Sequence, residues 1–572
     1  MIKGFKPNDI KNYTMEELEV LCDDIRGVVY DTVMQNGGHL ASNLGSVEVS
    51  VAICRVFDFP NDKIVFDVGH QCYPYKLLTG RWEKFSTLRQ RKGISGFPKR
   101  TESEYDCYDT GHAGTSLSAA IGLAKARDLK GEDRVVIAFI GDGSFQNGLV
   151  YEALNSLKIL NTNILIILNY KGMSIYPTVG GMHEILNEIT EGNKEENIRL
   201  LEGFSLQYIG VKNGNNLQEM IDSLEEAKEK LKNGSVLLHI LTKKGKGYEF
   251  SEDNPLITHG VSPANGRVDT EYSKVLGKTL LDVAKSNEKI VVITAAMTGS
   301  LGLDGFFSAY PNRSFDVGIC EENACVLASA MATQGLKPYY AIYSTFLQRS
   351  FDEIIHDVCA QDLPVVFCVD RAGISGADGE THQGVFDLSY LSMIPNMTIA
   401  VPKDTAEFEA MIRFSEGYQH PIAIRYPRCG NGLISETVEP IQVGAWEYLS
   451  KNNGAKATII GAGERVLRLA QQIKEELCKE GIVVDVVNAR FVKPMDEALL
   501  DEIKTPHVIT LEDNVKRGGL GEQVQLYLSQ RKDITTKIFA YRDAFIEHGA
   551  VAELQRDYGV DFDEIYRYVK GL

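Results

Sequence analysis

Short runs of apolar residues alternate with longer amphipathic stretches along most of the chain. In the first third, residues 134–140 form such a run, and Gly141-Asp142-Gly143 ends it. A segment with helical periodicity then extends to about residue 160, and a second apolar run covers 164–168. Apolar runs without polar alternation are typical of strands buried on both faces of a parallel sheet. The pattern predicts a β-α-β unit with an aspartate at the carboxyl end of its first strand, where open α/β sheets bind ligands.

Two further series of the same kind follow. The second begins near residue 272 and predicts strands at 290–294, 339–342, 365–370 and 422–426, with helices at 321–333 and 346–360. The third follows a polar junction at 450–454 and predicts strands at 457–460, 483–487, 508–511 and 537–541. We therefore predict an α/β protein of three domains, each with a mainly parallel sheet flanked by helices. The predicted domain bounds are 1–265, 272–432 and 440–572.

Charge and cysteine usage narrow the possible partners. Sixty basic and 78 acidic residues give a net charge of −18, which disfavours nucleic acid as a partner. No stretch has the roughly 18–20 consecutive apolar residues of a membrane span, and the start lacks the apolar core of a signal peptide. The ten cysteines contain no Cys-x-x-Cys pair, which predicts free thiols rather than disulfides or zinc sites. We expect a cytoplasmic protein that does not bind membranes.

The first series contains residues with candidate chemistry. Asp142 lies where it could hold a diphosphate through a divalent cation, but an aspartate there can also simply cap the following helix. Three histidines follow glycines, namely His39, His70 and His112. Glycine permits close approach of a ligand, and imidazole can donate hydrogen bonds or carry protons. Each histidine could equally be a structural residue.

The second series contains the densest group of polar residues. Residues 343–349 and the glycine-rich loop 370–384 follow predicted strands, and Arg425-Tyr426-Pro427-Arg428 follows a third. Arginines at the carboxyl ends of parallel strands can form a phosphate clamp, although isolated ones are often surface ion-pair partners. Glu321 begins a predicted helix, where a carboxylate is either a catalytic group or only a favourable partner of the helix dipole.

Together these segments resemble the thiamine-diphosphate enzymes of the transketolase superfamily, and in particular its 1-deoxy-D-xylulose-5-phosphate synthase family. The likeness extends from about residue 21 to the C-terminus. The segments that carry it are 69–76, 78–81, 111–116, 141–143, 242–248, 343–349, 370–384 and 490–494.

The resemblance implies a three-domain homodimer in which thiamine diphosphate lies between the first two domains. It also implies a reaction that decarboxylates pyruvate and joins the remaining two-carbon unit to glyceraldehyde 3-phosphate, within isoprenoid and thiamine biosynthesis. Glu321 matches the catalytic glutamate that bonds the aminopyrimidine, and Phe346 matches the aromatic residue stacked on that ring. The other matched catalytic positions are His39, His70, His259, His382 and Asp378. The other matched cofactor positions are His112, Gly141, Asp142, Gly143, Ser144, Lys171 and Met173. The matched substrate positions are Ser42, Tyr343, Arg349, Arg371, Arg425 and Arg428.

The sequence departs from the family at the magnesium site. The family pairs the aspartate matched by Asp142 with an asparagine about thirty residues later, and here Lys171 occupies that position. An ammonium group cannot coordinate a cation. Either Lys171 turns away and Asn169 or water replaces the ligand, or Lys171 itself neutralises the diphosphate, or Lys171 pairs with Asp142 and the cofactor site is lost. We favour the second hypothesis. The segment after Ile175 is also shorter than in the family.

Two other functions remain open at this point. One is a transketolase-like enzyme with another 2-oxo acid or a ketose as donor. The other is a non-catalytic paralogue that has lost the metal and the cofactor.

Overall fold

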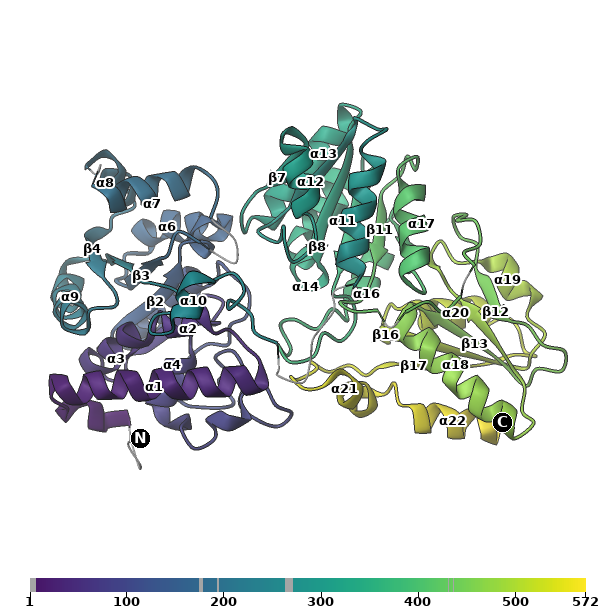
Figure 1. Ribbon diagram of the computed structural model, residues 1–572, viewed down its shortest axis with the longest axis horizontal. Helices are drawn as coiled ribbons and strands as arrows, with labels where there is room; N and C mark the ends of the chain where they lie inside the picture. Colours follow the sequence, from purple (N-terminus) through teal and green to yellow (C-terminus); the bar gives the residue numbers. More distant parts are fainter. Residues whose placement is uncertain (1–6, 174–177, 193–194, 263–270, 431, 436) are drawn as a thin grey trace. The chain divides into compact units, whose positions relative to one another are not determined.

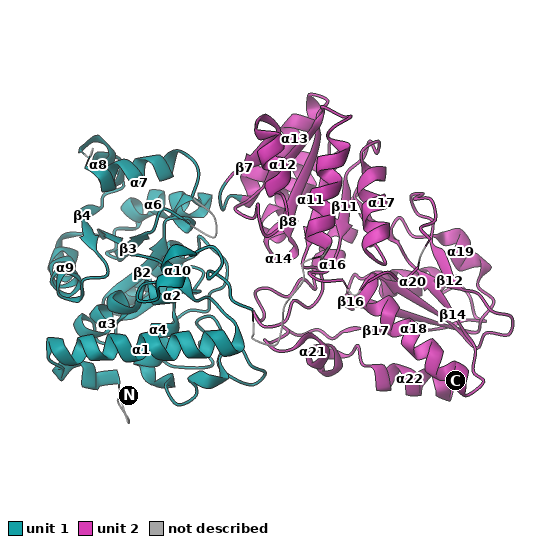
Figure 2. Ribbon diagram, in the orientation of Figure 1, with its two compact units in different colours: residues 1–267, 318–320 teal, residues 268–317, 321–572 magenta. Residues whose placement is uncertain are grey.

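The computed structural model describes residues 7–173, 178–192, 195–262, 271–430, 432–435 and 437–572 (Figure 1). The chain forms two compact units (Figure 2). Unit 1 comprises residues 1–267 and 318–320, and unit 2 comprises 268–317 and 321–572.

Unit 1 is built on one five-stranded sheet with the order β1-β2-β3-β5-β4, and every neighbouring pair is parallel. Its strands are β1 (Lys63–Phe66), β2 (Val136–Gly141), β3 (Leu165–Tyr170), β4 (Gln207–Asn213) and β5 (Val236–Leu241). Because the strands are parallel, their carboxyl ends meet at one edge of the sheet. The register pairs Gly141 with Asn169 and Tyr170 with Leu241, so the loops after β2, β3 and β5 are neighbours.

Helices surround this sheet, and their apolar faces form two buried clusters with the strands. The helices are α1 (Met15–Asn36), α2 (Ala41–Leu44), α3 (Val47–Val56), α4 (Tyr73–Lys76), α5 (Ser116–Lys130), α6 (Gly148–Leu160), α7 (Gly181–Glu191), α8 (Glu195–Glu202), α9 (Leu217–Lys230) and α10 (Glu249–Asp253). The side chain of Asn147 accepts a hydrogen bond from Leu149 N and so caps α6. The alternative in which Asp142 is only the cap of this helix is therefore wrong.

Unit 2 contains two sheets, both mainly parallel. The seven-stranded sheet has the order β15-β10-β11-β9-β8-β6-β7, and the five-stranded sheet has the order β12-β14-β13-β16-β17. The first sheet comprises β6 (Ile290–Thr294), β7 (Ser314–Asp316), β8 (Lys337–Tyr343), β9 (Val366–Asp370), β10 (Thr398–Ala400), β11 (Ile422–Arg425) and β15 (Phe491–Lys493). The second comprises β12 (Glu447–Ser450), β13 (Ala457–Ala462), β14 (Val484–Asn488), β16 (His507–Val515) and β17 (Thr535–Tyr541).

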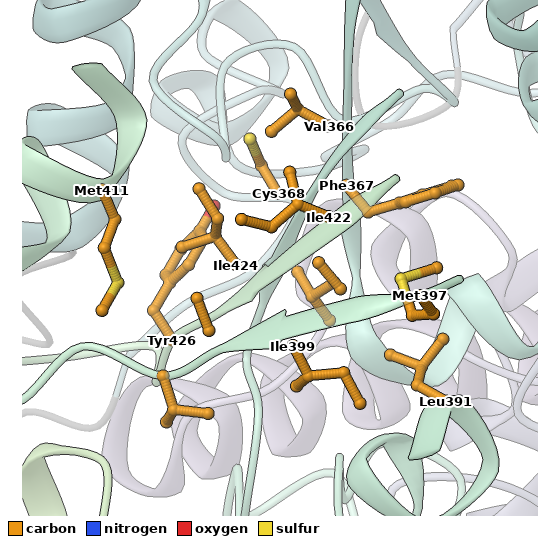
Figure 3. Close-up of a cluster of buried hydrophobic side chains, with 14 of the residues drawn as sticks. Val366, Phe367, Cys368, Leu391, Met397, Ile399, Met411, Ile422, Ile424 and Tyr426 are labelled. Atoms are coloured by element: carbon orange, nitrogen blue, oxygen red, sulfur yellow. The ribbon is translucent and has the colours of Figure 1, made fainter. Parts of the chain in front are cut away.

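Apolar side chains on β9, β10 and β11 fill the centre of the seven-stranded sheet. Figure 3 shows Phe367, Ile399 and Ile422 together with Met411 from a covering helix, and all four are buried. The helices of unit 2 are α11 (Glu271–Val283), α12 (Asp304–Ala309), α13 (Glu321–Thr333), α14 (Ser344–Leu347), α15 (Phe351–Glu353), α16 (Asp387–Ser392), α17 (Thr405–Ser415), α18 (Glu464–Lys479), α19 (Glu497–Glu502), α20 (Leu520–Leu528), α21 (Val551–Tyr558) and α22 (Phe562–Gly571).

A segment of the third predicted series joins the two sheets of unit 2. Strand β15 pairs antiparallel with β10, although it lies more than 90 residues later in the chain. Just before it, Arg490 is buried, and its Nε donates to Glu407 Oε1 on α17 at 2.7 Å. A buried ion pair of this kind is costly to break from one side, so it fixes how the two sheets meet.

The predicted α/β class with mainly parallel sheets is confirmed, and the predicted strands are found within a few residues of their expected bounds. The predicted continuous helix at 346–360 is wrong in detail. It is interrupted by a 3-10 turn at Gln348–Ser350 and a π-helical turn at Ile354–Cys359. The interruption brings Ser350 Oγ to 2.8 Å from the carbonyl oxygen of Glu321, to which it donates. The three-domain division stays a prediction.

The ten cysteines are all free thiols. Over the part of the chain that the structure describes, no helix combines the length and the apolar character needed to cross a bilayer.

Candidate active site

The carboxyl edge of the unit 1 sheet carries a group of polar residues that we call the lysine cluster, namely Gln71, Asp142, Asn169, Lys171 and Lys244. Asp142 follows β2 and is 2% exposed, and its Oδ2 accepts a hydrogen bond from Thr178 Oγ1 at 3.0 Å. Burial raises the pKa of Asp142, while Lys171, Thr178 and Lys244 counteract that increase. The parallel strand order thus brings together residues that lie up to 173 positions apart in the chain.

Both lysines of the cluster are held in a poorly solvated position. Burial and the charge of Lys244 lower the pKa of Lys171, and Asp142 only partly offsets this. Burial lowers the pKa of Lys244 to about 8. When both lysines are protonated, two ammonium groups beside one carboxylate give this edge a positive charge, in contrast to the acidic chain as a whole.

Two amides complete the cluster. Lys171 Nζ donates to Gln71 Oε1 at 2.9 Å, and Thr242 Oγ1 donates to Asn169 Oδ1 at 2.7 Å. These bonds fix the amide orientations, and they leave Gln71 Nε2 and Asn169 Nδ2 buried without a partner among the described residues. Unpartnered buried donors are rare because desolvating them is costly, so they indicate a ligand that accepts hydrogen bonds.

A cavity of about 690 Å³ adjoins the cluster and is lined in part by Lys171, Met173, Thr242 and Lys244. Gly141 ends β2, and Gly143 and Ser144 are buried in the turn that follows it. The predicted residue His112 lies half-buried in the loop before α5. This loop is held to the end of β1 because the amide of Gly114 donates a hydrogen bond to Asp67 Oδ1 at 2.8 Å. The start of the shorter segment after Ile175, up to residue 177, lies outside the described residues, and the chain is described again from residue 178, with α7 and α8 following.

Three predicted histidines form a triangle in unit 1. The ring centroids of His39, His70 and His259 lie 5.5 to 5.7 Å apart. Burial, together with nearby positive groups, lowers the pKa of His70 and of His259 well below the usual value, so both are neutral at pH 7. Their Nδ1 atoms are buried and have no hydrogen-bond partner within the described ranges. This disfavours a purely structural role for these two residues.

Sequence reasoning missed the residue that holds two corners of this triangle together. Asn43 is buried, and its Nδ2 donates to the carbonyl oxygens of His39 at 2.6 Å and His70 at 2.7 Å. Its Oδ1 accepts from Tyr73 N at 2.9 Å. The neighbouring predicted residue Ser42 is completely buried on α2, and its hydroxyl has no partner in the described part of the chain.

In unit 2, Glu321 is the first residue of α13 and is 3% exposed. Burial raises its pKa to about 7, although Arg349 Nη1 lies 3.8 Å from Glu321 Oε2. A carboxylate that served only the helix dipole would be stabilised in its charged form, whereas this one favours the protonated form. Glu321 Oε2 has no hydrogen-bond partner among the described residues, so the carboxyl group is available to a ligand.

Aromatic and basic residues lie at the carboxyl ends of β8 and β9. The rings of Tyr343 and Phe346 stack at a centroid distance of 5.5 Å, and Phe346 contacts His382 edge-on at 5.6 Å. Arg371 lies over Tyr343 with its Cζ 3.6 Å from the ring centroid, and it pairs with Asp370 at 2.7 Å. The structure thus brings these predicted residues together, and Asp378 lies half-buried on the same loop.

The two remaining arginines differ in their surroundings. Arg425 is 3% exposed, and its Nε donates to both carboxylate oxygens of Asp387 at 2.8 and 2.9 Å. Its Nη2 donates to the carbonyl oxygens of Gly384 and Asp513. Arg425 therefore stabilises the loop from inside. Arg428 is half-buried, and its Nε lacks a partner in the described ranges, which fits an anion-binding role better.

The loop 370–384 is fixed by residues that the sequence did not single out. Gln383 is 1% exposed, and its Oε1 accepts from the amides of Ser375 and Gly376 at 2.7 and 3.0 Å. Asp513, on β16, accepts from Ile374 N at 3.2 Å. Gly373 has φ +77°, and a Cβ atom there would lie 2.0 Å from the Asp513 carboxylate. The five-stranded sheet of unit 2 thus holds the loop that carries His382.

The metal site does not fit a divalent cation. Of the two expected ligand positions, Asp142 is present, and the other is occupied by an ammonium group. No group of three or more His, Cys, Asp or Glu side chains within the described residues is placed to hold a metal ion.

Comparisons with known proteins agree with this arrangement. Residues 3–201 match the family model 1-deoxy-D-xylulose-5-phosphate synthase, 269–430 match the transketolase pyrimidine-binding domain, and 444–565 match the transketolase C-terminal domain. The 1-deoxy-D-xylulose-5-phosphate synthase of Clostridium botulinum (strain Alaska E43 / Type E3) is 43% identical over 97% of this chain and 96% of its own length. That of Clostridium beijerinckii is 44% identical over 99% and 98%.

Among solved structures, the transketolase of Campylobacter jejuni is 18% identical with a TM-score of 0.47, and covers 98% of this chain and 100% of its own. A split-gene transketolase, described as an inactive β4 tetramer, is 29% identical with a TM-score of 0.48, over 52% of this chain and 97% of its own.

Proposed function

Since this chain belongs to the 1-deoxy-D-xylulose-5-phosphate synthase family, we propose that it is a thiamine-diphosphate-dependent transferase that joins the two-carbon unit of pyruvate to glyceraldehyde 3-phosphate. The observation that carries the proposal is the identity of 43% to a curated synthase along nearly the whole of both chains. The product would serve isoprenoid and thiamine biosynthesis. A transketolase-like enzyme with another donor and a non-catalytic paralogue are not favoured by identity of this extent.

Thiamine diphosphate, when bound, supplies the electron sink that stabilises the carbanion left by decarboxylation. The chain has residues that fit each part of this cofactor. The lysine cluster offers the diphosphate two lysines and two N–H donors that have no partner among the described residues. Glu321 has a carboxyl group for a ring nitrogen, and Phe346 has an aromatic face for a flat ring.

The pKa of Glu321, about 7, suits proton exchange with a weakly basic ring nitrogen near neutral pH. Below that pH the carboxyl group holds its proton and donates it, and above it the carboxylate accepts one. The neutral imidazoles of His70 and His259 can donate a hydrogen bond to a substrate carbonyl or accept a proton from a hydroxyl group.

Arg371, Arg428 and Tyr343 suit the phosphorylated acceptor. Guanidinium groups match phosphate oxygens in pairs, and the stacking of Arg371 on Tyr343 restricts its rotamers before the substrate binds. We assign Arg425 to loop stability rather than to substrate. Arg349, which lies near Glu321, would bind substrate and influence the proton affinity of that carboxyl group.

We further propose a cytoplasmic homodimer that binds only small molecules and neither nucleic acid nor membrane. The net charge of −18 and the ten free thiols support the location and the absence of nucleic acid. The dimer rests on the family resemblance, and sedimentation equilibrium of the purified chain tests it.

The reaction is tested by carbon dioxide release from carboxyl-labelled pyruvate in the presence of thiamine diphosphate. We expect release only when glyceraldehyde 3-phosphate is also present, with 1-deoxy-D-xylulose 5-phosphate as the product in NMR spectra. Turnover with a ketose donor instead of pyruvate would point to the transketolase-like alternative. A protein that neither binds the cofactor nor releases carbon dioxide would contradict both enzyme functions.

A further inference from the structure

The lysine cluster has the composition of an anion site rather than of a cation site. Around Asp142 it contains two ammonium groups, from Lys171 and Lys244, both of which act on the pKa of that carboxyl group. A divalent cation beside Asp142 would be attracted by one carboxylate and repelled by two ammonium groups. The sum of these charges disfavours the cation and favours a group with several negative oxygens.

The hydrogen-bonding capacity of the cluster leads to the same conclusion. Gln71 Oε1 and Asn169 Oδ1, the two amide oxygens that could serve a metal ion, are already occupied by Lys171 Nζ and Thr242 Oγ1. The amide atoms left without a partner in the described part of the chain are donors, namely Gln71 Nε2 and Asn169 Nδ2. Donors bind phosphate oxygens and repel cations. The geometry therefore disfavours the alternative in which Asn169 replaces the missing metal ligand.

The ammonium group of Lys171 is also held in a position from which it can bind a ligand in the adjacent cavity. Its Nζ is fixed at 2.9 Å from Gln71 Oε1, and an ammonium group has two further protons to donate. Lys171 and Lys244 both line the cavity of about 690 Å³ next to the cluster. An ordered lysine that lines a cavity can bind a phosphate oxygen with a charge-assisted hydrogen bond.

We propose that this chain binds the diphosphate of its cofactor through the ammonium groups of Lys171 and Lys244, without a divalent cation. The proposal rests on thiamine diphosphate being the cofactor, as inferred above. It makes Lys171 the functional replacement of the metal and not a sign of a lost site.

The direct test is calorimetric titration of the full-length protein with thiamine diphosphate, once in EDTA and once in excess Mg²⁺. We expect dissociation constants that agree within about threefold. Binding that is more than tenfold tighter with Mg²⁺ would overturn the role of Lys171 and leave the proposed function intact. No binding under either condition would overturn both. Thiamine without phosphate is titrated in parallel, and it should bind at least 100-fold more weakly.

The variant Lys171→Asn provides a second test, because it restores an amide where the family has its metal ligand. We expect its binding to fall at least 100-fold in EDTA and to recover in Mg²⁺. Binding of Mn²⁺, followed by electron paramagnetic resonance in the presence of thiamine diphosphate, should show one bound ion in the variant and none in the original protein. One tightly bound Mn²⁺ in the original protein would refute the proposal.

Lys243→Asn is the matched control. Lys243 lines the same cavity, but its ammonium group is bonded to Glu252 and is exposed. Its removal takes one positive charge from the same cavity without changing the lysine cluster. We expect the metal independence to persist in this variant. If Lys243→Asn also made binding depend on Mg²⁺, general charge and not the position of Lys171 would be responsible.

Discussion

Replacing Glu321 by glutamine should change stability in a way that depends on pH. The pKa of Glu321 is about 7 in the folded protein, against an ordinary value of 4.5. A carboxyl group whose pKa is raised by folding does not lower the free energy of unfolding when it is protonated in both the folded and the unfolded state, near or below pH 4.5. The cost grows as the pH rises and is complete above about 7. At about 1.4 kcal/mol for each pH unit between the two values, the full cost is about 3 kcal/mol.

Glutamine keeps the shape of Glu321 but cannot ionise, so it avoids this cost. For unit 2, with roughly 300 residues, about 3 kcal/mol corresponds to a rise of about 5 °C in melting temperature at pH 8. At pH 5 the difference should be less than about 1 kcal/mol, or 1 to 2 °C. Differential scanning calorimetry of both proteins at several pH values measures the difference.

Glu322→Gln is the control for Glu321→Gln. Glu322 is the next residue of α13 and is only half-buried, so its replacement should not reproduce the rise at pH 8. A difference between Glu321→Gln and the original protein that does not change between pH 5 and 8 would refute the argument. The same variant should lose about 10²-fold or more in turnover, because glutamine cannot exchange a proton with the cofactor.

Four further variants and one control test the site. Asn43→Ala removes the hydrogen bonds to the carbonyl oxygens of His39 and His70, so we expect the free energy of unfolding to fall by about 2 to 4 kcal/mol and kcat to be reduced. Arg425→Ala breaks a buried ion pair and should lower the free energy of unfolding by about 3 to 5 kcal/mol. Arg428→Ala should leave the melting temperature unchanged and raise KM for glyceraldehyde 3-phosphate about tenfold or more. The opposite pattern would exchange their roles. Gly373→Ala places a methyl group 2.0 Å from Asp513 and should reduce both stability and activity. Gly432→Ala has a similar φ with open space, and it measures the cost of backbone strain alone.

The strands that were predicted could be recognised because they are local apolar runs. Residues 290–294 and 422–426 read as buried strands in the sequence and are β6 and, to within one residue, β11. The grouping of candidate residues followed from the same prediction. Once strands are parallel, the residues after them meet at one edge, as Asp142 and Lys171 do.

The residues that sequence reasoning missed act over long distances in the chain. Asp513 accepts a hydrogen bond from Ile374, which lies 139 positions earlier, and Gln71 accepts one from the predicted Lys171, which lies 100 positions later. Neither contact leaves a local pattern, because the partners become neighbours only when the sheets are complete. Strand β15 was missed for a similar reason. A segment of three residues is too short to show the hydrophobic periodicity of a strand. Phe491–Lys493 is a strand because it pairs with β10.

Lys171 shows how one substitution can be interpreted differently from sequence and from structure. In the sequence, a lysine at a metal-ligand position is compatible with a lost site, and decay alone would account for it. In the structure, its ammonium group has a fixed acceptor and a second lysine nearby, and the amide donors around it have no partner among the described residues. A decayed site would not be expected to keep buried N–H groups unpaired, because each costs about 1 to 3 kcal/mol. Such a cost is offset by a bound group that accepts these bonds, and beside two lysines an anion suits this role.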